Sequence, residues 1–250
     1  MSLLRKKLDL EPRLPDHIKN GVGIWRNLHL AICDVFSSLT QDSWERADVE
    51  VTYGDLKALR ADLPPHGLSF GFGNVEGMCG LLVHFEGEFS ARVTSQSLGS
   101  EANAPEAGYE PNLLDLLLLK PLADCCEEEL NKLFVSGFGA RKTSLRQIGQ
   151  GLSPQMFDMP RGISLWNEVT FLIKKMPPKG EIQPDPTDYA ALEAGATIEA
   201  ETTHARPSGT LAFKMLMPQT ILQNLIATFA ANNNSGDNDD SGPWADHMYR

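Results

Sequence analysis

Four stretches of the chain place apolar residues at helical spacing. Over residues 28–39 they recur at i, i+4, i+7, i+8 and i+11, which is the stripe of an amphipathic helix. Residues 119–134 carry the strongest stripe, and shorter ones cover 89–98 and 219–231. The pattern predicts four helices, with the principal one over 119–134.

Strand patterns lie between these helices. Val49, Val51 and Tyr53 alternate with polar residues after a turn over 42–46, as in a strand with one buried face. A helix followed by antiparallel strands, repeated once along the chain, predicts an α+β domain. We expect a pseudo-two-fold arrangement with antiparallel sheets and packed helices. Further strand candidates, rich in β-branched and aromatic residues, are 68–72, 78–85, 165–174, 198–201 and 210–217.

Prolines interrupt the pattern at two places. Pro121 lies inside the principal helical stripe and has no N–H, so the apolar run before it forms a separate turn or the helix kinks there. Residues 175–189 contain four prolines, which predicts an extended connection.

The chain divides into an N-terminal segment over 1–24, a globular domain over 25–231 and a tail over 232–250. Residues 232–242 are only Asn, Ser, Gly and Asp, and such a segment buries too little apolar surface to offset its chain entropy. Trp244 and Met248 follow, so we expect another element to begin there and this chain to be the first part of a longer protein.

Composition excludes several functional classes. The 250 residues are 42% hydrophobic and 22% charged, as in globular proteins. With 22 Lys and Arg against 33 Asp and Glu, the net charge is −11, which argues against binding to the phosphate backbone of nucleic acids. No apolar run approaches the roughly 20 residues that a membrane-spanning helix needs.

Cysteine and histidine spacing predicts neither a metal site nor a cofactor. Cys33, Cys79, Cys125 and Cys126 form no C-x-x-C pair, so we expect reduced, buried thiols in a cytoplasmic protein. The six histidines are scattered and form no His-x3-His pair.

A family resemblance rests on the order and spacing of three stretches. They are a helix and a "VEVT" strand over 28–59, LLVHFEGEFSARVTSQSLG over 81–99, and EPNLLDLLLLKPLADCCEEELNKLF over 110–134. Together they resemble the family that holds the middle domain of the flagellar motor switch protein FliM and the CheC and CheX phosphatases. The resemblance covers about residues 25–231 and implies a SpoA-type C-terminal domain after the tail.

The phosphatases of that family carry a D-x3-E-x2-N-x22-P motif, whose spacing Asp124, Glu128, Asn131 and Pro154 match. At 100° per residue the first three side chains share a narrow arc opposite the apolar stripe, so we expect all three to face solvent. The resemblance implies that Glu128 engages the regulator's lysine and that Asn131 orients the attacking water. The alternative to a catalytic motif is that this face of the helix is polar only because it is exposed to solvent.

Two functions follow from the resemblance. The first is a non-enzymatic, FliM-like subunit of the switch ring at the cytoplasmic face of the flagellar basal body. Its implied partners are FliG-like and FliN-like rotor proteins, further copies of itself and phosphorylated CheY, and Gly99, Ser100, Glu101 and Ala102 occupy the position of the FliG-contacting loop. The alternative is a CheC-like phosphatase of a phosphorylated CheY-type regulator. Neither function implies a cofactor of its own.

Overall fold

A computed structural model describes residues 21–73, 79–99, 109–138, 144–177 and 209–235. The predicted strand over 198–201 and most of the connection over 175–189 lie outside these residues. In chain order the elements are η1 (Gly21–Trp25), α3 (Arg26–Thr40), β1 (Trp44–Gly54), α4 (Leu56–Ala61), β2 (Gly67–Gly73), β3 (Cys79–Glu86), α5 (Gly87–Ser97), α6 (Leu113–Leu118), α7 (Lys120–Phe138), β4 (Arg146–Gly151), η2 (Pro154–Met156), β5 (Trp166–Lys175), β6 (Thr210–Pro218) and α9 (Gln219–Ser235).

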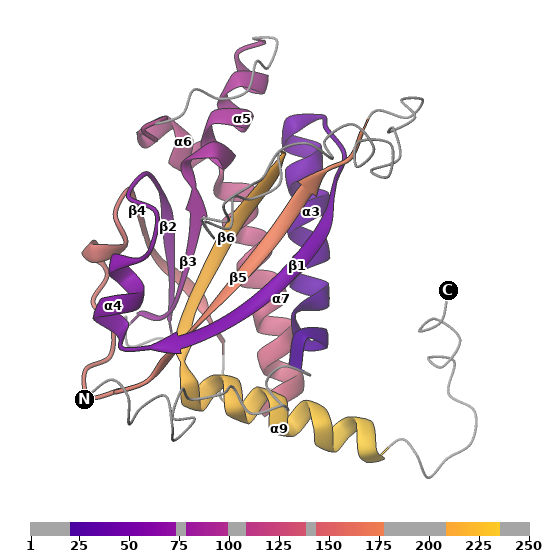
Figure 1. The fold of residues 1–250 in the computed structure, drawn as a ribbon, viewed down its shortest axis with the longest axis vertical. Coiled ribbons are helices and arrows are strands. Elements are labelled where there is room, and N and C mark those ends of the chain that lie inside the picture. Colours follow the sequence, from indigo (N-terminus) through magenta and orange to yellow (C-terminus); the bar gives the residue numbers. More distant parts are fainter. Residues whose placement is uncertain (1–20, 74–78, 100–108, 139–143, 178–208, 236–250) are drawn as a thin grey trace, which may run out of the picture.

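The strands form one six-stranded antiparallel sheet in the order β1-β5-β6-β3-β2-β4 (Figure 1). The first half of the chain runs α3, β1, α4, β2, β3, α5, and the second half runs α7, β4, η2, β5, β6, α9. In this comparison β1, β2 and β3 correspond to β4, β5 and β6. When each strand is replaced by its counterpart, the order of strands in the sheet is the same, counted from the opposite edge. The predicted α+β class and its internal two-fold symmetry are confirmed, with the approximate axis between β3 and β6.

One face of the sheet is covered by α3 and α7, which lie side by side behind it in Figure 1. Alternate strand residues point into this layer, as the period of two requires. Phe171 and Phe213 lie at its centre on neighbouring strands, with stacked rings 4.5 Å apart between centroids. The burial of such rings, each worth roughly 1.5–3 kcal/mol, holds the two halves together.

The opposite face combines a small apolar cluster with a row of polar side chains. Leu59 of α4, Phe157 and Trp166 belong to the cluster. Beside it, Ser69 Oγ lies 2.9 Å from His84 Nδ1, and Lys214 Nζ lies 2.9 Å from Glu168 Oε1. Burial lowers the pKa of His84 to about 4, and the nearby Lys214 charge acts in the same direction.

Both edge strands carry a bulge that a helix side chain stabilises. In β1 two residues, Ala47 and Asp48, lie opposite Leu172 of β5 alone, and His29 Nε2 of α3 lies 3.0 Å from the Leu172 carbonyl oxygen. In β4 the register with β2 shifts at Ile148. Bulges twist an edge strand and hinder pairing with a further strand.

Several element boundaries differ from the predictions. The predicted turn over 42–46 is wrong at its end, because Trp44 packs 5.0 Å from Phe36, centroid to centroid, and pairs with Lys175 as the first residue of β1. Ile24 and Trp25 are buried, so the fold begins before residue 25. At the other end, α9 continues to Ser235, four residues into the stretch predicted as linker.

Of the two possibilities at Pro121, the structure has the separate turn. Helix α6 ends at Leu118, and Pro121 lies in the first turn of α7, where its missing N–H leaves no helical hydrogen bond unmade. The sequence pattern did not predict α4 or β4. β4 contains two glycines and is a strand because it pairs with β2.

Candidate functional site

The outward side of α7 next to β4 holds three of the four predicted motif residues. A shallow surface hollow of about 640 Å³ lies there. Helical spacing brings the motif residues of α7 to one surface, as the sequence predicts. The hollow is lined by Asp124, Glu127, Glu128, Asn131, Lys132 and Val135.

Asp124 and Glu128 face solvent, as predicted, with side chains 57% and 69% exposed. Each is paired with a lysine one helical turn away: Lys120 Nζ to Asp124 Oδ1 is 2.5 Å, and Lys132 Nζ to Glu128 Oε1 is 2.8 Å. Hydrogen bonds to Glu128 and Glu129 raise the pKa of Lys132. Exposed pairs of this kind add little stability, so a cationic partner could displace either lysine at small cost.

Asn131 does not project freely into solvent, which corrects the prediction for this residue. Its Nδ2 donates to the Leu145 carbonyl oxygen at 2.8 Å, and its Oδ1 accepts from the Leu145 backbone N–H at 2.8 Å. The side chain is half-buried. The Asn131 amide thus binds the backbone immediately before β4 through one of its two N–H donors and one of the two lone pairs of its oxygen, and these two bonds fix its orientation.

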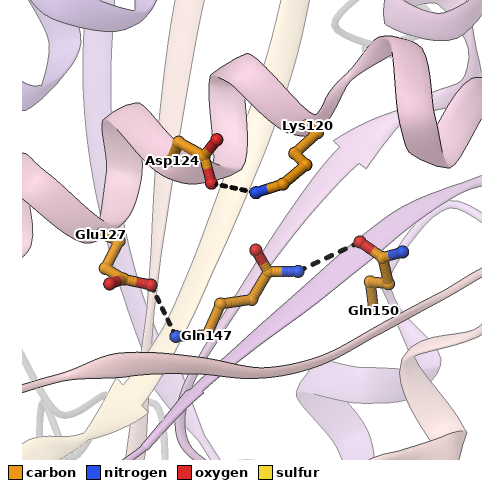
Figure 2. A network of polar contacts seen from close by, with 5 residues as sticks. All are labelled: Lys120, Asp124, Glu127, Gln147 and Gln150. Carbon is orange, nitrogen blue, oxygen red and sulfur yellow. Dashed lines mark hydrogen bonds and ion pairs between the residues drawn. The ribbon is translucent and has the colours of Figure 1, made fainter.

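Glu127, which the motif does not include, also connects α7 to β4. Its Oε2 accepts from the backbone N–H of Gln147 at 2.7 Å, and Gln147 Nε2 donates to Gln150 Oε1 at 3.1 Å (Figure 2). Gln147 is next to Ile148, where the β4 register shifts, so Glu127 pairs a backbone donor beside the bulge. The sequence gives no signal for this role, because β4 itself is not predicted.

Pro154 is not among the residues that line the hollow. It is the buried first residue of η2, and its carbonyl oxygen accepts a hydrogen bond from Arg60 Nη2 of α4. Arg60 Nη2 also lies 3.3 Å from the Phe157 carbonyl oxygen. Since α4 and η2 are related by the internal symmetry, Arg60 joins equivalent elements of the two halves, through the backbone rather than the ring of Pro154.

The predicted FliG-contacting loop is described only at its first residue. Gly99 follows α5 with φ of +68°, a left-handed conformation that favours glycine. Ser100, Glu101 and Ala102 lie outside the described residues.

Neither the cysteines nor a cluster of metal-ligating side chains forms a site in the described part of the chain. All four cysteines are free; three are buried and Cys125 is half-buried. Burial raises the pKa of Cys33 to about 12 and those of Cys79 and Cys125 to about 11, so their reactive thiolate forms are disfavoured. Among the described residues no group of three or more His, Cys, Asp or Glu could hold a metal ion.

None of the helices in the described ranges combines the length and the apolar character needed to cross a bilayer.

Comparison with known proteins gives a match in fold but not in sequence. No protein-family model matches the chain, and no curated protein matches it. FliY from Thermotoga maritima superimposes with a TM-score of 0.58 at 9% identity, covering 88% of this chain and 98% of that one. The FliM middle domain from H. pylori gives 0.56 at 8%, covering 86% and 99%. FliM in the FliG–FliM complex from H. pylori gives 0.55 at 9%, covering 86% and 99%. This chain therefore has the fold of these FliM and FliY structures.

Proposed function

We propose that this protein is a FliM-like structural and signalling subunit of a flagellar motor switch, acting through protein contacts rather than catalysis. One observation carries the proposal. The pseudo-two-fold domain covers 98% of the FliY chain and 99% of the FliM middle domain, so it reproduces that fold as a whole. The order of helix, strand and loop segments in the sequence points to the same family.

The expected partners follow from the same fold. A FliM chain of this fold is found in complex with FliG in H. pylori. For this chain we propose a FliG-like partner at the loop beginning at Gly99, with FliN-like proteins, further copies of itself and phosphorylated CheY as additional partners. In this proposal the protein works at the cytoplasmic face of the basal body, and residues 232–250 lead toward a SpoA-type domain.

The contacts of Asn131 give this residue a structural role that the scaffold accounts for without catalysis. Its amide bonds both the N–H and the carbonyl oxygen of Leu145, which holds the chain before β4 against α7. The observation that favours the phosphatase is the hollow itself, which brings Asp124, Glu128 and Asn131 to one surface.

One pair of measurements tests the proposal against this alternative. The first is binding of the purified chain to the FliG-type protein of the same organism, by calorimetry. The second is the dephosphorylation rate of phosphorylated CheY from that organism, with and without the chain. The scaffold predicts binding and an unchanged rate.

Acceleration of dephosphorylation that disappears in Glu128→Gln but persists in Glu88→Gln would establish the phosphatase. Both glutamates are exposed, and Glu88 lies on α5 rather than α7, so the second variant controls for the loss of one surface charge. If the chain neither binds FliG nor accelerates the reaction, the proposed function is wrong.

A further inference from the structure

Side chains of α7 hold backbone groups at the free edge of β4. This strand is the last in the sheet order, so no strand of the described ranges pairs with its outer edge. In an antiparallel pair, alternate residues direct their N–H and C=O away from the neighbouring strand. Leu145 and Gln147 are two residues apart, and α7 binds the backbone of both. Three backbone groups that a further strand would need are therefore already in use.

The Asn131 amide takes the place of the backbone of such a strand. It donates to the Leu145 carbonyl oxygen and accepts from the Leu145 N–H, both at 2.8 Å. Two residues of an antiparallel ladder exchange the same pair of hydrogen bonds. Glu127, one helical turn earlier, accepts from the Gln147 N–H at 2.7 Å. The spacings agree, because four residues of a helix and two residues of a strand each span about 6–7 Å.

The two edges of the sheet differ in charge. β1 carries four charged residues, at positions 45, 46, 48 and 50, and charged side chains discourage pairing of an edge strand. β4 has the sequence RQIGQG, in which Arg146 is the one charged residue. The β4 edge therefore lacks the charges that protect β1, and the contacts from α7 are found at this less protected edge.

We propose that Glu127 and Asn131, which we call the α7 cap, close the β4 edge against strand pairing with a second copy of this chain. The excluded partner is β4 of that copy. A strand with so little charge can pair with itself in the antiparallel direction about a two-fold axis, without placing like charges opposite each other. The inference goes beyond the proposed function and does not rest on it.

A pair formed through β4 would also oppose the proposed ring. A contact that uses the same surface on both copies closes at two copies, whereas a ring needs head-to-tail contacts between different surfaces. The α7 cap thus keeps the chain available for assembly through its other surfaces.

The test compares two double variants of the full chain. Glu127→Ala with Asn131→Ala removes the α7 cap. Glu128→Ala with Asn27→Ala is the matched control, because it removes the same two types of side chain from exposed positions. Sedimentation velocity over a range of concentrations measures self-association. We expect the cap-deleted variant to dimerise with an affinity about tenfold or more above that of the control.

Hydrogen exchange identifies the surface that associates. At low concentration we expect the amides of Leu145 and Gln147 to exchange about tenfold faster or more in the cap-deleted variant than in the control. These amides should regain protection as the concentration rises, because the second copy then supplies their partners. Faster exchange without this recovery would show that the α7 cap only stabilises the fold, and would overturn the inference. Protection gained in β1 would overturn the choice of β4 as the partner strand.

Gln147→Pro, added to the cap-deleted variant, is a second test. Proline has no N–H to offer to a further strand, so we expect the dimer to be lost. Association that survives this substitution contradicts the inference, as does a cap-deleted variant that associates no more than the control. If that variant is unfolded, Glu127→Ala alone frees only the Gln147 N–H and must show the same recovery of protection at Gln147. FliG takes no part in these measurements, so the proposed function is tested separately.

Discussion

Glu128 and Asn131 lie on the same side of α7 but have different environments. Glu128 is exposed and pairs with Lys132, another exposed side chain. Asn131 is half-buried and makes two hydrogen bonds to the backbone of Leu145. Removing a charge from a solvated pair costs little, whereas removing a side chain that satisfies two backbone groups leaves both without that partner.

We therefore expect Asn131→Ala to lower the free energy of unfolding by about 1–3 kcal/mol. Glu128→Ala, the matched control from the same motif, is expected to change it by less than about 0.5 kcal/mol. Urea denaturation of both variants provides the measurement. Small effects of equal size would show that the two hydrogen bonds between Asn131 and Leu145 contribute nothing to stability.

Two buried histidines make stability dependent on pH. Burial lowers the pKa of His29, and that of His84, from 6.5 to about 4. Between pH 6.5 and 4 the unfolded chain binds protons at these residues and the folded chain does not, so stability falls as the pH is lowered through this range. The loss is at most about 3 kcal/mol for each residue and is complete below pH 4.

The measurement is the free energy of unfolding at several pH values between 7 and 4. His84→Gln is expected to reduce the slope in this range, whatever its effect on stability at pH 7. A His84→Gln slope equal to the native one contradicts the assignment.

At the scale of elements, the connection after β4 packs on the sheet because β2 contains a glycine at the contact. A Cβ atom at Gly71 would lie 2.6 Å from the Phe157 ring and 3.0 Å from Cys79 Sγ. Phe157 belongs to the small apolar cluster that also holds Leu59 of α4. The absence of a side chain at Gly71 thus allows η2 to approach the sheet, where Arg60 binds the carbonyl oxygens of Pro154 and Phe157.

Gly71→Ala is expected to destabilise the protein by about 1–3 kcal/mol, because Phe157 must leave its position. Gly80→Ala on the neighbouring strand is the matched control. The nearest atom to a Cβ there is the Phe72 carbonyl oxygen at 3.9 Å, so this substitution is expected to be neutral or slightly stabilising. Thermal melts of the two variants would contradict the packing argument if their order were reversed.

At the scale of the whole molecule, each half supplies an edge strand to the other. β1 of the first half pairs with β5 of the second, and β4 of the second half pairs with β2 of the first. Within one half, the described strands leave only the antiparallel pair β2–β3 or β5–β6, with the edge strand unpaired. A lone two-stranded sheet is marginal in water, so the halves depend on each other for folding.

We expect fragments 1–104 and 105–250 to be unfolded when separate and to gain structure when mixed, as measured by circular dichroism. The intact chain is expected to unfold in a single transition by calorimetry, because its sheet is shared. A first half that is folded by itself, with a sharp melt, would show that the exchanged edge strands are dispensable.

For the candidate site, the sequence by itself placed Asp124, Glu128 and Asn131 together, because helical spacing is a local property. It could not foresee that the Asn131 amide binds Leu145, since that contact spans fourteen residues. Glu127 was missed for the same reason, because its partner Gln147 lies on a strand that the sequence does not predict. Nearby residues in the sequence determine which side of a helix a side chain lies on. Its hydrogen-bond partners depend on the segment that folding packs against it.

For the fold, the hydrophobic pattern determined the long helices and the central strands, because their periodicity reflects which side is buried. It also indicated the α+β class and the repeat of the two halves. Only the tertiary structure decided the rest: β4 is a strand because β2 pairs with it, and Trp44 belongs to β1 because Lys175 pairs with it. It also decided that Asp115 of α6 is buried while Leu113 and Leu117 are exposed, since Thr94, one of the donors to Asp115, lies on another helix. These features depend on partners brought together by folding, and no local pattern encodes such partners.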